Sequence, residues 1–419
     1  MEEGRGGMTV KLAFISNYYN HHQSSLCEAW DRITEHRFAF IQTQPFSQER
    51  REKGWTEAKH VPFAMAYGEM GTEDTARFID ACETVILGDA PLGTVGNRLK
   101  SRDVVFKYSE RICKRGFRPV KWLPRFARFW YRYGRRRSLY LLSAGAYAAR
   151  DFAIHGALAG KSYRWGYFPE TRRYDTDALL NCKNPRKMLW CGRFLDWKHP
   201  DDALSVAKRL KEEGYAFELE MIGAGGMLPA IRESIEEEGL SGCVHLSGAM
   251  SPGDVRARME RAGVFLFTSD FQEGWGVVLN EAMNSGCAVV ASHAAGAVPY
   301  LIRHQENGLI YQSGDIDGLY MQAKALLDSP GMQRTLGTQA YHTITELWNA
   351  EVAAERLLHL AQEIREHGRC DLYQDGPCSR APMIRDDWFK GRGRHDIQGT
   401  ADETALVSRE QRIRRNGAF

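Results

Sequence analysis

The sequence predicts an α/β protein built from two doubly wound, Rossmann-like domains that face a central cleft. In the first half of the chain, short apolar runs alternate with helical stretches, as strands and crossover helices do in a parallel sheet. The same alternation restarts after the polar, loop-like stretch Asn181–Pro185. At 419 residues the chain is also too long for one ordinary core, which favours two or more domains.

Apolar runs that end in small or polar residues predict the strands of the first half. These runs are Val10–Ser16, Thr84–Leu87, Asp103–Tyr108 and Leu139–Leu142. Ligands of open α/β sheets collect at the carboxyl ends of the strands. We therefore expect the first half to form one wall of a binding cleft.

The second half repeats this pattern with helices between the strands. The predicted strands are Lys187–Trp190, Phe217–Ile222, Val244–Leu246, Val264–Phe267 and Ala288–Ala291. The predicted helices are Pro200–Glu213, Leu228–Glu238, Pro252–Ala262 and, at the end of the folded region, Ala350–Glu366. We divide the chain into an N-terminal domain (1–182), a C-terminal domain (183–345), a terminal helix that crosses back (346–368) and a polar, mobile or loosely attached tail (369–419).

The composition excludes several classes of protein. With 43% hydrophobic and 26% charged residues the chain is globular and not disordered. Nine cysteines without regular spacing indicate free thiols in a reducing compartment. No apolar run approaches the roughly 20 residues that span a bilayer. We therefore expect a cytoplasmic protein.

Positive charge is concentrated between residues 111 and 137. This segment holds eleven Lys or Arg side chains and no Asp or Glu, with Phe, Trp and Tyr interleaved. Such a composition favours an element that lies in the headgroup region of an anionic membrane, on the inner face of the plasma membrane. Two alternatives remain open: a solvated basic helix packed by its aromatic residues, and a nucleic-acid surface. We expect no nucleic-acid partner, because no recognisable nucleic-acid fold accompanies the segment.

Two carboxylates, Glu273 and Glu281, stand where a glycine-flanked loop runs into a predicted helix. Eight residues of helix would separate them by roughly 12 Å along the axis. A helix N-terminus attracts phosphate, and carboxylates accept hydrogen bonds from sugar hydroxyls. The pair therefore indicates a long, polyhydroxylated, anionic ligand such as a nucleotide sugar.

Arg193 and Lys198 follow the predicted strand Lys187–Trp190, where they can converge on a diphosphate. Taken alone, the two would more often be ordinary surface cations. Gly223 and Gly225 form a glycine pair where another predicted strand runs into a loop. Such a pair by itself is only weak evidence for a ligand site and usually marks a simple turn.

Taken together, these residues resemble glycosyltransferase family 4, the retaining group 1 transferases with the GT-B fold. The resemblance runs through Cys191-Gly192-Arg193, Lys198, Ile222-Gly223-Ala224-Gly225, Leu246-Ser247-Gly248, Ser269, Glu273-Gly274-Trp275-Gly276, Glu281-Ala282-Met283, Gly286, Val290-Ala291-Ser292, Gly296, Pro299 and Asn307-Gly308-Leu309. It covers Lys187 to about Ser313 closely. Leu139–Glu170 looks like the family's last strand region before the interdomain linker.

The resemblance implies a role for each matched residue. Arg193 and Lys198 would bind the donor diphosphate, Glu281 would accept the ribose hydroxyls, and Glu273 would contact the donor sugar ring. The remaining candidate donor-binding residues are Gly274, Trp275, Gly276 and Val277 through their amides, Gly225 and Met250 beside the base, and Asn17. The family needs no divalent ion, so we expect neither a metal nor another cofactor.

The N-terminal half departs from the family pattern at two places. Many members carry a histidine after the strand equivalent to Val104–Tyr108, where this chain has Ser109-Glu110. Glu110 is our candidate for the N-terminal group that touches the sugar; the alternative is a carboxylate that complements a helix N-terminus. The first strand ends in Asn17–Gln23, where the family commonly has a glycine pair. His21 and His22 in this stretch either face the cleft or act as surface or capping residues.

The function that follows is a metal-independent transfer, with retention, from a nucleotide sugar to a glycan or lipid-linked saccharide. The resemblance places it in assembly of a cell-surface polysaccharide or lipopolysaccharide. One alternative is a GT-B nucleotide-sugar epimerase, which needs no acceptor. The other is a non-catalytic basic scaffold or nucleic-acid-binding protein that kept a sugar-binding fold.

Overall fold

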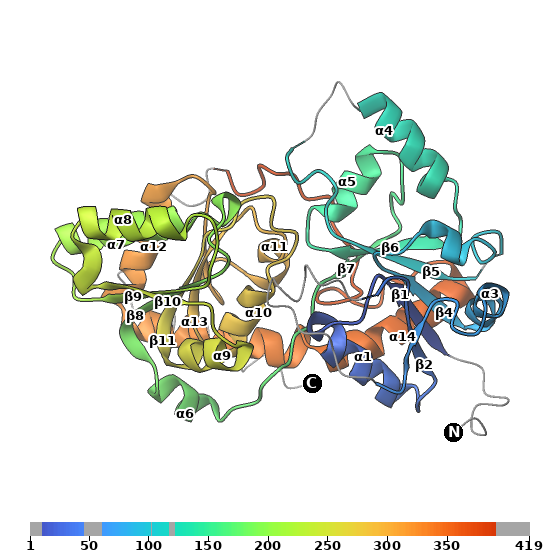
Figure 1. The fold of residues 1–419 in the computed structure, drawn as a ribbon, viewed down its shortest axis with the longest axis horizontal. Coiled ribbons are helices and arrows are strands. Elements are labelled where there is room, and N and C mark those ends of the chain that lie inside the picture. The colour runs from blue at the N-terminus through green and yellow to red at the C-terminus, as the bar shows by residue number, and fades with distance from the viewer. Residues whose placement is uncertain (1–10, 46–60, 102, 117–121, 391–419) are drawn as a thin grey trace, which may run out of the picture.

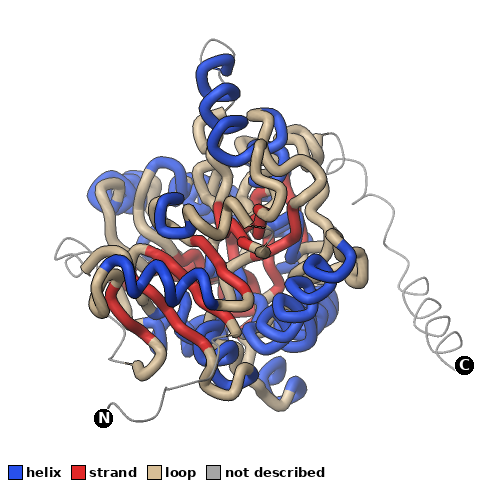
Figure 2. The backbone as a smooth tube through the Cα atoms, turned by 90° about the vertical axis from the view of Figure 1, so that its right-hand side faces the viewer, coloured by secondary structure: helices blue, strands red, loops and turns tan. Residues whose placement is uncertain are grey.

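A computed structural model of the chain describes residues 11–45, 61–101, 103–116 and 122–390. These residues form two α/β domains that lie side by side, each around its own parallel sheet (Figure 1). Helices enclose the strands of both sheets, as Figure 2 shows from the side. The predicted fold class, two doubly wound domains, is confirmed.

The N-terminal domain contains a seven-stranded parallel sheet in the order β3-β2-β1-β4-β5-β6-β7. Its strands are β1 (Leu12–Ser16), β2 (Phe38–Gln42), β3 (Ala64–Ala66), β4 (Thr84–Leu87), β5 (Val105–Ser109), β6 (Leu139–Ala144) and β7 (Ser162–Trp165). Its helices are α1 (His21–Ile33), α3 (Thr72–Ala81), α4 (Trp122–Phe129) and α5 (Ala148–Ile154). The central strands are buried on both faces, which explains their nearly continuous apolar sequence.

The C-terminal domain contains a six-stranded parallel sheet in the order β10-β9-β8-β11-β12-β13. Its strands are β8 (Asn184–Cys191), β9 (Glu218–Ile222), β10 (Val244–Gly248), β11 (Ala262–Phe267), β12 (Ala288–Ser292) and β13 (Leu309–Tyr311). Its helices are α6 (Thr176–Asn181), α7 (Pro200–Glu212), α8 (Leu228–Glu237), α9 (Pro252–Arg261), α10 (Val277–Asn284), α11 (Val298–Leu301), α12 (Ile316–Asp328) and α13 (Pro330–His342).

The stretch expected to separate the halves is not all loop. Asn184 and Pro185 already belong to β8, and Asn184 pairs with Ala262 of β11. A proline is tolerated at the first positions of a strand, where its missing N–H breaks little of the ladder. The polar composition of the stretch therefore reflects the exposed start of a strand.

Helix α14 (Ala350–His367) leaves the C-terminal domain and crosses under the N-terminal domain, where it lies beside α1 (Figure 1). Asn349 caps its first turn by accepting a hydrogen bond from the amide of Val352, and Gly368 ends it in the left-handed conformation, with φ of 74°. Arg365, in its last turn, donates to the carbonyl of Glu83 in the N-terminal domain at 3.2 Å. The return of the terminal helix therefore matches the sequence prediction.

Residues 369–390 differ from the mobile or loosely attached tail that we expected. Cys370, Cys378, Ser379 and Phe389 are buried, and the segment 378–381 pairs with the edge strand β7. Arg164 of β7 donates its amide to the carbonyl of Ser379 at 2.7 Å and accepts from the amide of Cys378 at 2.9 Å. Glycine and proline remove any periodicity here, so sequence analysis misses contacts that backbone groups make. The rest of the predicted tail, 391–419, lies outside the described residues.

Helix α4 projects from the top of the N-terminal domain in Figure 1. Its inner side packs on α5: the Trp122 indole donates to the carbonyl of Ile154 at 2.8 Å, and the Phe126 ring lies against Gly156. Its outer side and the following turn expose Leu123, Trp130 and Tyr131 by 67%, 47% and 66%. Within the part of the chain described, no helix is long and apolar enough to cross a bilayer.

Candidate functional site

The candidate site forms where loops from the carboxyl ends of the C-terminal sheet meet those of the N-terminal sheet. The loop after β11 carries Glu273 and Gly274 and leads into α10. We call this loop, residues 268–276, the donor loop. The backbone of Gly274 lies against that of Gly296: a Cβ on Gly296 would be 1.9 Å from the Gly274 carbonyl oxygen. The loop is thus held by close backbone contacts that only glycine permits.

Glu273 and Lys198 meet at the centre of the site. The Lys198 amine contacts the Glu273 carboxylate, and both side chains are 13% exposed. The Ser269 hydroxyl donates to the same carboxylate at 3.2 Å. Lys198 is positioned by its own carbonyl, which accepts from the Thr268 hydroxyl at 2.6 Å. The structure therefore brings together a predicted sugar contact and a predicted diphosphate ligand.

The spacing of Glu273 and Glu281 suggested that both lie along one helix, but in the structure they do not. Helix α10 begins only at Val277, after Gly276, whose φ of 99° belongs to the left-handed region. A Cβ on Gly276 would be 2.4 Å from the Phe267 ring, so this sharp entry requires glycine. Glu273 therefore occupies the loop, whereas Glu281 stands on the helix, and the free amides of its first turn lie between them.

Glu281 is half-buried on α10. Burial raises the pKa of its carboxyl, and the nearby Arg256 and Arg172 oppose this increase. Arg256 is itself buried and donates to Asn284 at 2.6 Å. A partly exposed carboxylate in this environment can still accept hydrogen bonds from ligand hydroxyls.

Arg193 is exposed, and its guanidinium lies 5.8 Å from the centre of the Trp197 ring. The Lys198 amine lies 4.6 Å from the same ring. Trp197 thus has both predicted diphosphate ligands near its ring, within the range of cation–π attraction. Its aromatic side chain carries no motif signal, and sequence analysis did not single it out.

The loop Gly223–Gly225 packs under the strand end that carries Arg193. Gly225 has φ of 155°, and a Cβ there would be 2.4 Å from the Phe194 carbonyl oxygen. The amide of Phe194 donates to the Ala224 carbonyl at 2.9 Å. These glycines therefore allow two loops to pack closely. Their role goes beyond the simple turn that was the alternative for this glycine pair. Met250, the other residue expected beside the base, is half-buried after β10.

The Trp275 side chain is buried between the two domains. It is 1% exposed, its indole donates to Asn280 at 2.8 Å, and its ring packs near Tyr300 and Trp348. Gly166 of the N-terminal domain lies against it, since a Cβ there would be 2.3 Å from the indole ring. Only the backbone of Trp275 is left for the donor, while its side chain joins the two domains.

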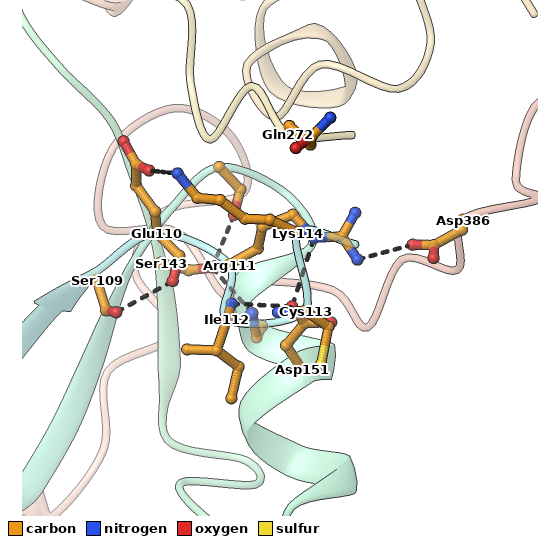
Figure 3. Close-up of polar contacts among 12 residues, drawn as sticks. Ser109, Glu110, Arg111, Ile112, Cys113, Lys114, Ser143, Asp151, Gln272 and Asp386 are labelled. Atoms are coloured by element: carbon orange, nitrogen blue, oxygen red, sulfur yellow. Dashed lines mark hydrogen bonds and ion pairs between the residues drawn. The ribbon is translucent and has the colours of Figure 1, made fainter. Parts of the chain in front are cut away.

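Glu110 reaches the C-terminal domain across the interdomain boundary. A Cβ on Gly274 would lie 2.0 Å from Glu110 Oε2, so the carboxylate sits directly on the donor loop. Tyr167 donates its hydroxyl to Glu110 at 3.1 Å. Lys114 donates its amine to the same carboxylate at 2.6 Å (Figure 3). Residues 110–116 form no helix, so Glu110 caps no helix of its own loop.

Asn17, His21 and His22 lie at the carboxyl end of β1. Asn17 donates to Asp89, after β4, at 3.0 Å. The two imidazole rings lie 3.9 Å apart at the start of α1, where Asn20 provides the cap. Burial, and secondarily the neighbouring His21, lowers the pKa of His22 to about 3. His22 is therefore neutral at physiological pH, and the pair is not the cap itself.

Among the described residues, two groups of three side chains have potential metal-ligand atoms within 4.8 Å of one another. They are His199, Asp201 and Asp202, and Glu363, Glu366 and His367. The first group directly follows Lys198. His199 has a left-handed backbone conformation, with φ of 47°.

Comparison with known proteins agrees with this geometry. Residues 174–343 match the family model of the group 1 glycosyl transferases. The chain is 31% identical over 161 residues to the amylovoran biosynthesis glycosyltransferase AmsK of Erwinia amylovora, a match that covers 37% of this chain and 39% of AmsK. It is 27% identical over 187 residues to the putative colanic acid biosynthesis glycosyltransferase WcaL of Escherichia coli K12, covering 43% and 46%. The chain thus spans less than half the length of these relatives.

Solved structures extend the likeness to both domains. HepE of Anabaena, crystallised with UDP, superposes with a TM-score of 0.62 at 14% identity, covering 85% of this chain and 98% of HepE. A glycosyltransferase of Rickettsia africae gives 0.60 at 12% identity, covering 86% and 100%. At such identities the likeness shows the fold alone. Residues 174–343 of this chain are therefore similar to the group 1 glycosyl transferases, within a chain that has the GT-B fold.

Proposed function

We propose that this chain is a glycosyltransferase that moves a sugar from a nucleotide-sugar donor to a glycan or lipid-linked saccharide, with retention at the anomeric carbon. The observation that carries the proposal is the contact between Lys198 and Glu273 in the loop before α10, opposite Glu110 of the other domain. Relatives named for amylovoran and colanic acid biosynthesis support a cell-surface polysaccharide as the product. Neighbours crystallised with UDP and UDP-glucose support a nucleotide-sugar donor.

The charges of the site suit departure of a diphosphate. Negative charge grows on the leaving group as the sugar–oxygen bond breaks, and Lys198, Arg193 and the free amides at the start of α10 stabilise it. Lys198 pairs with Glu273. A bound diphosphate would compete for this amine and leave the Glu273 carboxylate free to position the sugar ring.

Glu110 supplies the acceptor side of the site in this proposal. Its carboxylate faces the donor loop, while Tyr167 and Lys114 hold it from the N-terminal domain. A carboxylate so placed can orient the hydroxyl that attacks the sugar, and it can stabilise positive charge on the ring. Glu281 binds the ribose hydroxyls on the far side, so the two domains bracket the donor.

The test measures transfer by the Glu273→Gln and Lys198→Ala variants with the best donor and acceptor. We expect each to lose about 100-fold or more in kcat, as with other lost electrostatic groups in active sites, while folding normally. Lys208→Ala and Glu238→Gln form the control, because this exposed Lys–Glu pair joins α7 to the residue that follows α8. Near-normal turnover in either site variant would contradict the assignment. Activity in EDTA is expected to equal that without it, because we propose no metal.

The epimerase alternative can be separated without an acceptor. Proton NMR of the protein with donor alone would show conversion of the nucleotide sugar if an epimerase were present. We expect no such conversion, since the matched relatives are named as transferases.

We also propose that α4 contacts an anionic membrane on the cytoplasmic side, where a lipid-linked acceptor would lie. Exposed Leu123, Trp130 and Tyr131 stand beside Arg128, Arg132 and Arg135, which suits the boundary between headgroups and acyl chains. The Arg135 guanidinium lies 5.5 Å from the Trp130 ring, so charge and aromatic surface are presented together.

Flotation with vesicles that contain phosphatidylglycerol tests this contact. Replacing Arg128, Arg132 and Arg135 by Ser should reduce binding about 100-fold, since each cation near an anionic surface contributes about 1 kcal/mol. Arg232→Ser, Arg258→Ser and Arg261→Ser remove equal charge from the C-terminal domain and serve as the control. Equal flotation of both triple variants and the wild type would remove the membrane from the proposal.

A further inference from the structure

The segment 369–390 joins both domains next to the candidate site. Its Asp375 carboxylate pairs with Arg164 of the N-terminal domain at 2.6 Å and with Arg303 of the C-terminal domain. Arg356 of α14 donates to the Asp375 carbonyl at 2.6 Å. The segment is therefore fixed on one side by cations from three parts of the fold.

Its far end is fixed beside the donor loop. The Trp388 indole donates to the Tyr147 hydroxyl at 2.9 Å, and Phe389 is buried against His293. The His293 Nδ1 accepts from the amide of Ser313 at 2.9 Å, so its other nitrogen, Nε2, is the one that donates to the Asp386 carbonyl at 3.1 Å. Burial lowers the pKa of His293, which keeps this tautomer neutral.

Asp386 reaches from this end into the loop that carries Glu110. Its carboxylate accepts a hydrogen bond from the Arg111 guanidinium at 3.2 Å (Figure 3). Asp151 lies 3.4 Å from Arg111 Nε and also accepts from the amides of Ile112 and Cys113, at 3.0 and 2.8 Å. One buried cation thus ties the loop to α5 and to the C-terminal segment.

Arg111 also touches the donor loop. Its guanidinium lies 5.4 Å from the Phe271 ring and 4.9 Å from the Tyr147 ring. The side chain is 2% exposed, and within the described residues its Nε and Nη1 find no hydrogen-bond partner. A buried cation of this kind depends strongly on the few carboxylates that remain to it. Asp386 is one of only two described carboxylates paired with it.

We propose that Asp386 is a positioning residue for glycosyl transfer, which acts through Arg111 to hold Glu110 against Gly274. This inference rests on the proposed function, because Glu110 has its role there. The C-terminal segment then belongs to the transfer site, although it lies outside the matched family region 174–343. Loss of the Asp386 charge would loosen the loop around Arg111 and let the Glu110 carboxylate move away from the reacting sugar.

The experiment compares Asp386→Asn with Asp387→Asn in the full chain. Asp387 is the neighbouring carboxylate, 53% exposed and paired with Arg385, so its variant controls for charge and position. We expect Asp386→Asn to lower kcat about 10-fold or more with donor KM within about 2-fold, because misplacing a group by about 1 Å can cost up to 100-fold. Asp386→Glu should recover part of the loss. Equal kcat for Asp386→Asn and the wild type, or an equal loss in Asp387→Asn, would overturn the inference.

A second measurement does not depend on activity. Hydrogen exchange at the amides of Ile112 and Cys113 should be faster in Asp386→Asn and unchanged in Asp387→Asn, because only the first loosens the Arg111 loop. Unchanged exchange in both would contradict the positioning role. A wild-type protein that transfers no sugar from any donor would instead overturn the proposed function, and the exchange data would still decide whether Asp386 holds the loop.

Discussion

At the scale of single residues, three glycines permit the approach of the two domains. Gly145 directly follows strand β6 of the N-terminal domain. It has φ of 98°, and a Cβ there would be 2.3 Å from the Gly274 carbonyl oxygen. Gly296 meets the same carbonyl from the C-terminal domain, and the Ala146 amide donates to the Gly296 carbonyl at 2.9 Å. The position of Glu273 therefore depends on neighbours that have no side chain.

The first prediction concerns Gly296→Ala. The added methyl group would meet backbone atoms that cannot turn aside, so the loop with Glu273 and Gly274 must shift. We expect kcat to fall about 10-fold or more and the protein to lose about 1–3 kcal/mol of stability, the usual cost of overpacking. Steady-state kinetics and urea denaturation measure both quantities.

Gly331→Ala is the matched control for this change. Gly331 lies in the first turn of α13, has open space around its Cα, and should accept alanine with unchanged activity. If Gly296→Ala behaved like Gly331→Ala, the close packing of the donor loop would not matter for transfer.

At the scale of elements, an aromatic stack joins α14 to both domains. Trp348, just before α14, is 1% exposed and stacks on Tyr300 of α11, with ring centres 5.9 Å apart. On the N-terminal side it stacks near Phe168 at 6.3 Å, and its ring also lies 5.8 Å from that of Trp275. The crossing helix thus begins in the shared core, which fixes where the chain returns to the N-terminal domain.

The second prediction is that Trp348→Ala destabilises the protein by about 3–5 kcal/mol, as expected when a large buried aromatic side chain is removed. Trp130→Ala, at the exposed end of α4, should change stability by less than about 0.5 kcal/mol. Chemical denaturation followed by circular dichroism measures the difference. Comparable losses in both variants would show that the stack contributes little.

Individual elements were predicted best where the sequence carries a continuous apolar run or a helical apolar period. Strand β4 and helix α7 were predicted nearly as they occur, because a buried strand has a continuous apolar run and an amphipathic helix repeats its apolar side. Strands β2, β3, β7 and β13 were missed. Strands β3 and β13 have only three residues each, and β7, Ser162–Trp165, alternates polar and aromatic side chains. Strand β2, Phe38–Gln42, is a buried apolar run like β4, so its omission has no such cause.

At the scale of the whole molecule, the donor would lie between the domains and contact both. Glu281, Lys198 and Arg193 belong to the C-terminal domain, whereas Glu110 comes from the N-terminal domain. Ligand that binds only the folded protein adds stability according to its concentration relative to Kd. Donor binding should therefore raise the melting temperature.

The third prediction is that one member of a panel of UDP- and GDP-sugars raises the melting temperature well above the rest. At a concentration of about 100 times Kd, a ligand adds about 2.7 kcal/mol. Lys198→Ala should abolish most of this shift by removing a diphosphate ligand, while Lys208→Ala should keep it. A panel in which no nucleotide sugar changes the melting temperature would favour the non-catalytic scaffold.

The sequence by itself determined the two parallel sheets, the donor loop and the order of Arg193, Lys198, Glu273 and Glu281. Those features depend on local apolar periodicity and on short motifs, which the chain expresses over a few residues. Only the tertiary structure decided the partners of Glu110 and the packed C-terminal segment. Arg111 and Asp386 are 275 residues apart, and neither has a local pattern that points to the other. Their contact exists because α14 returns the chain to the N-terminal domain and the following segment covers the edge of its sheet.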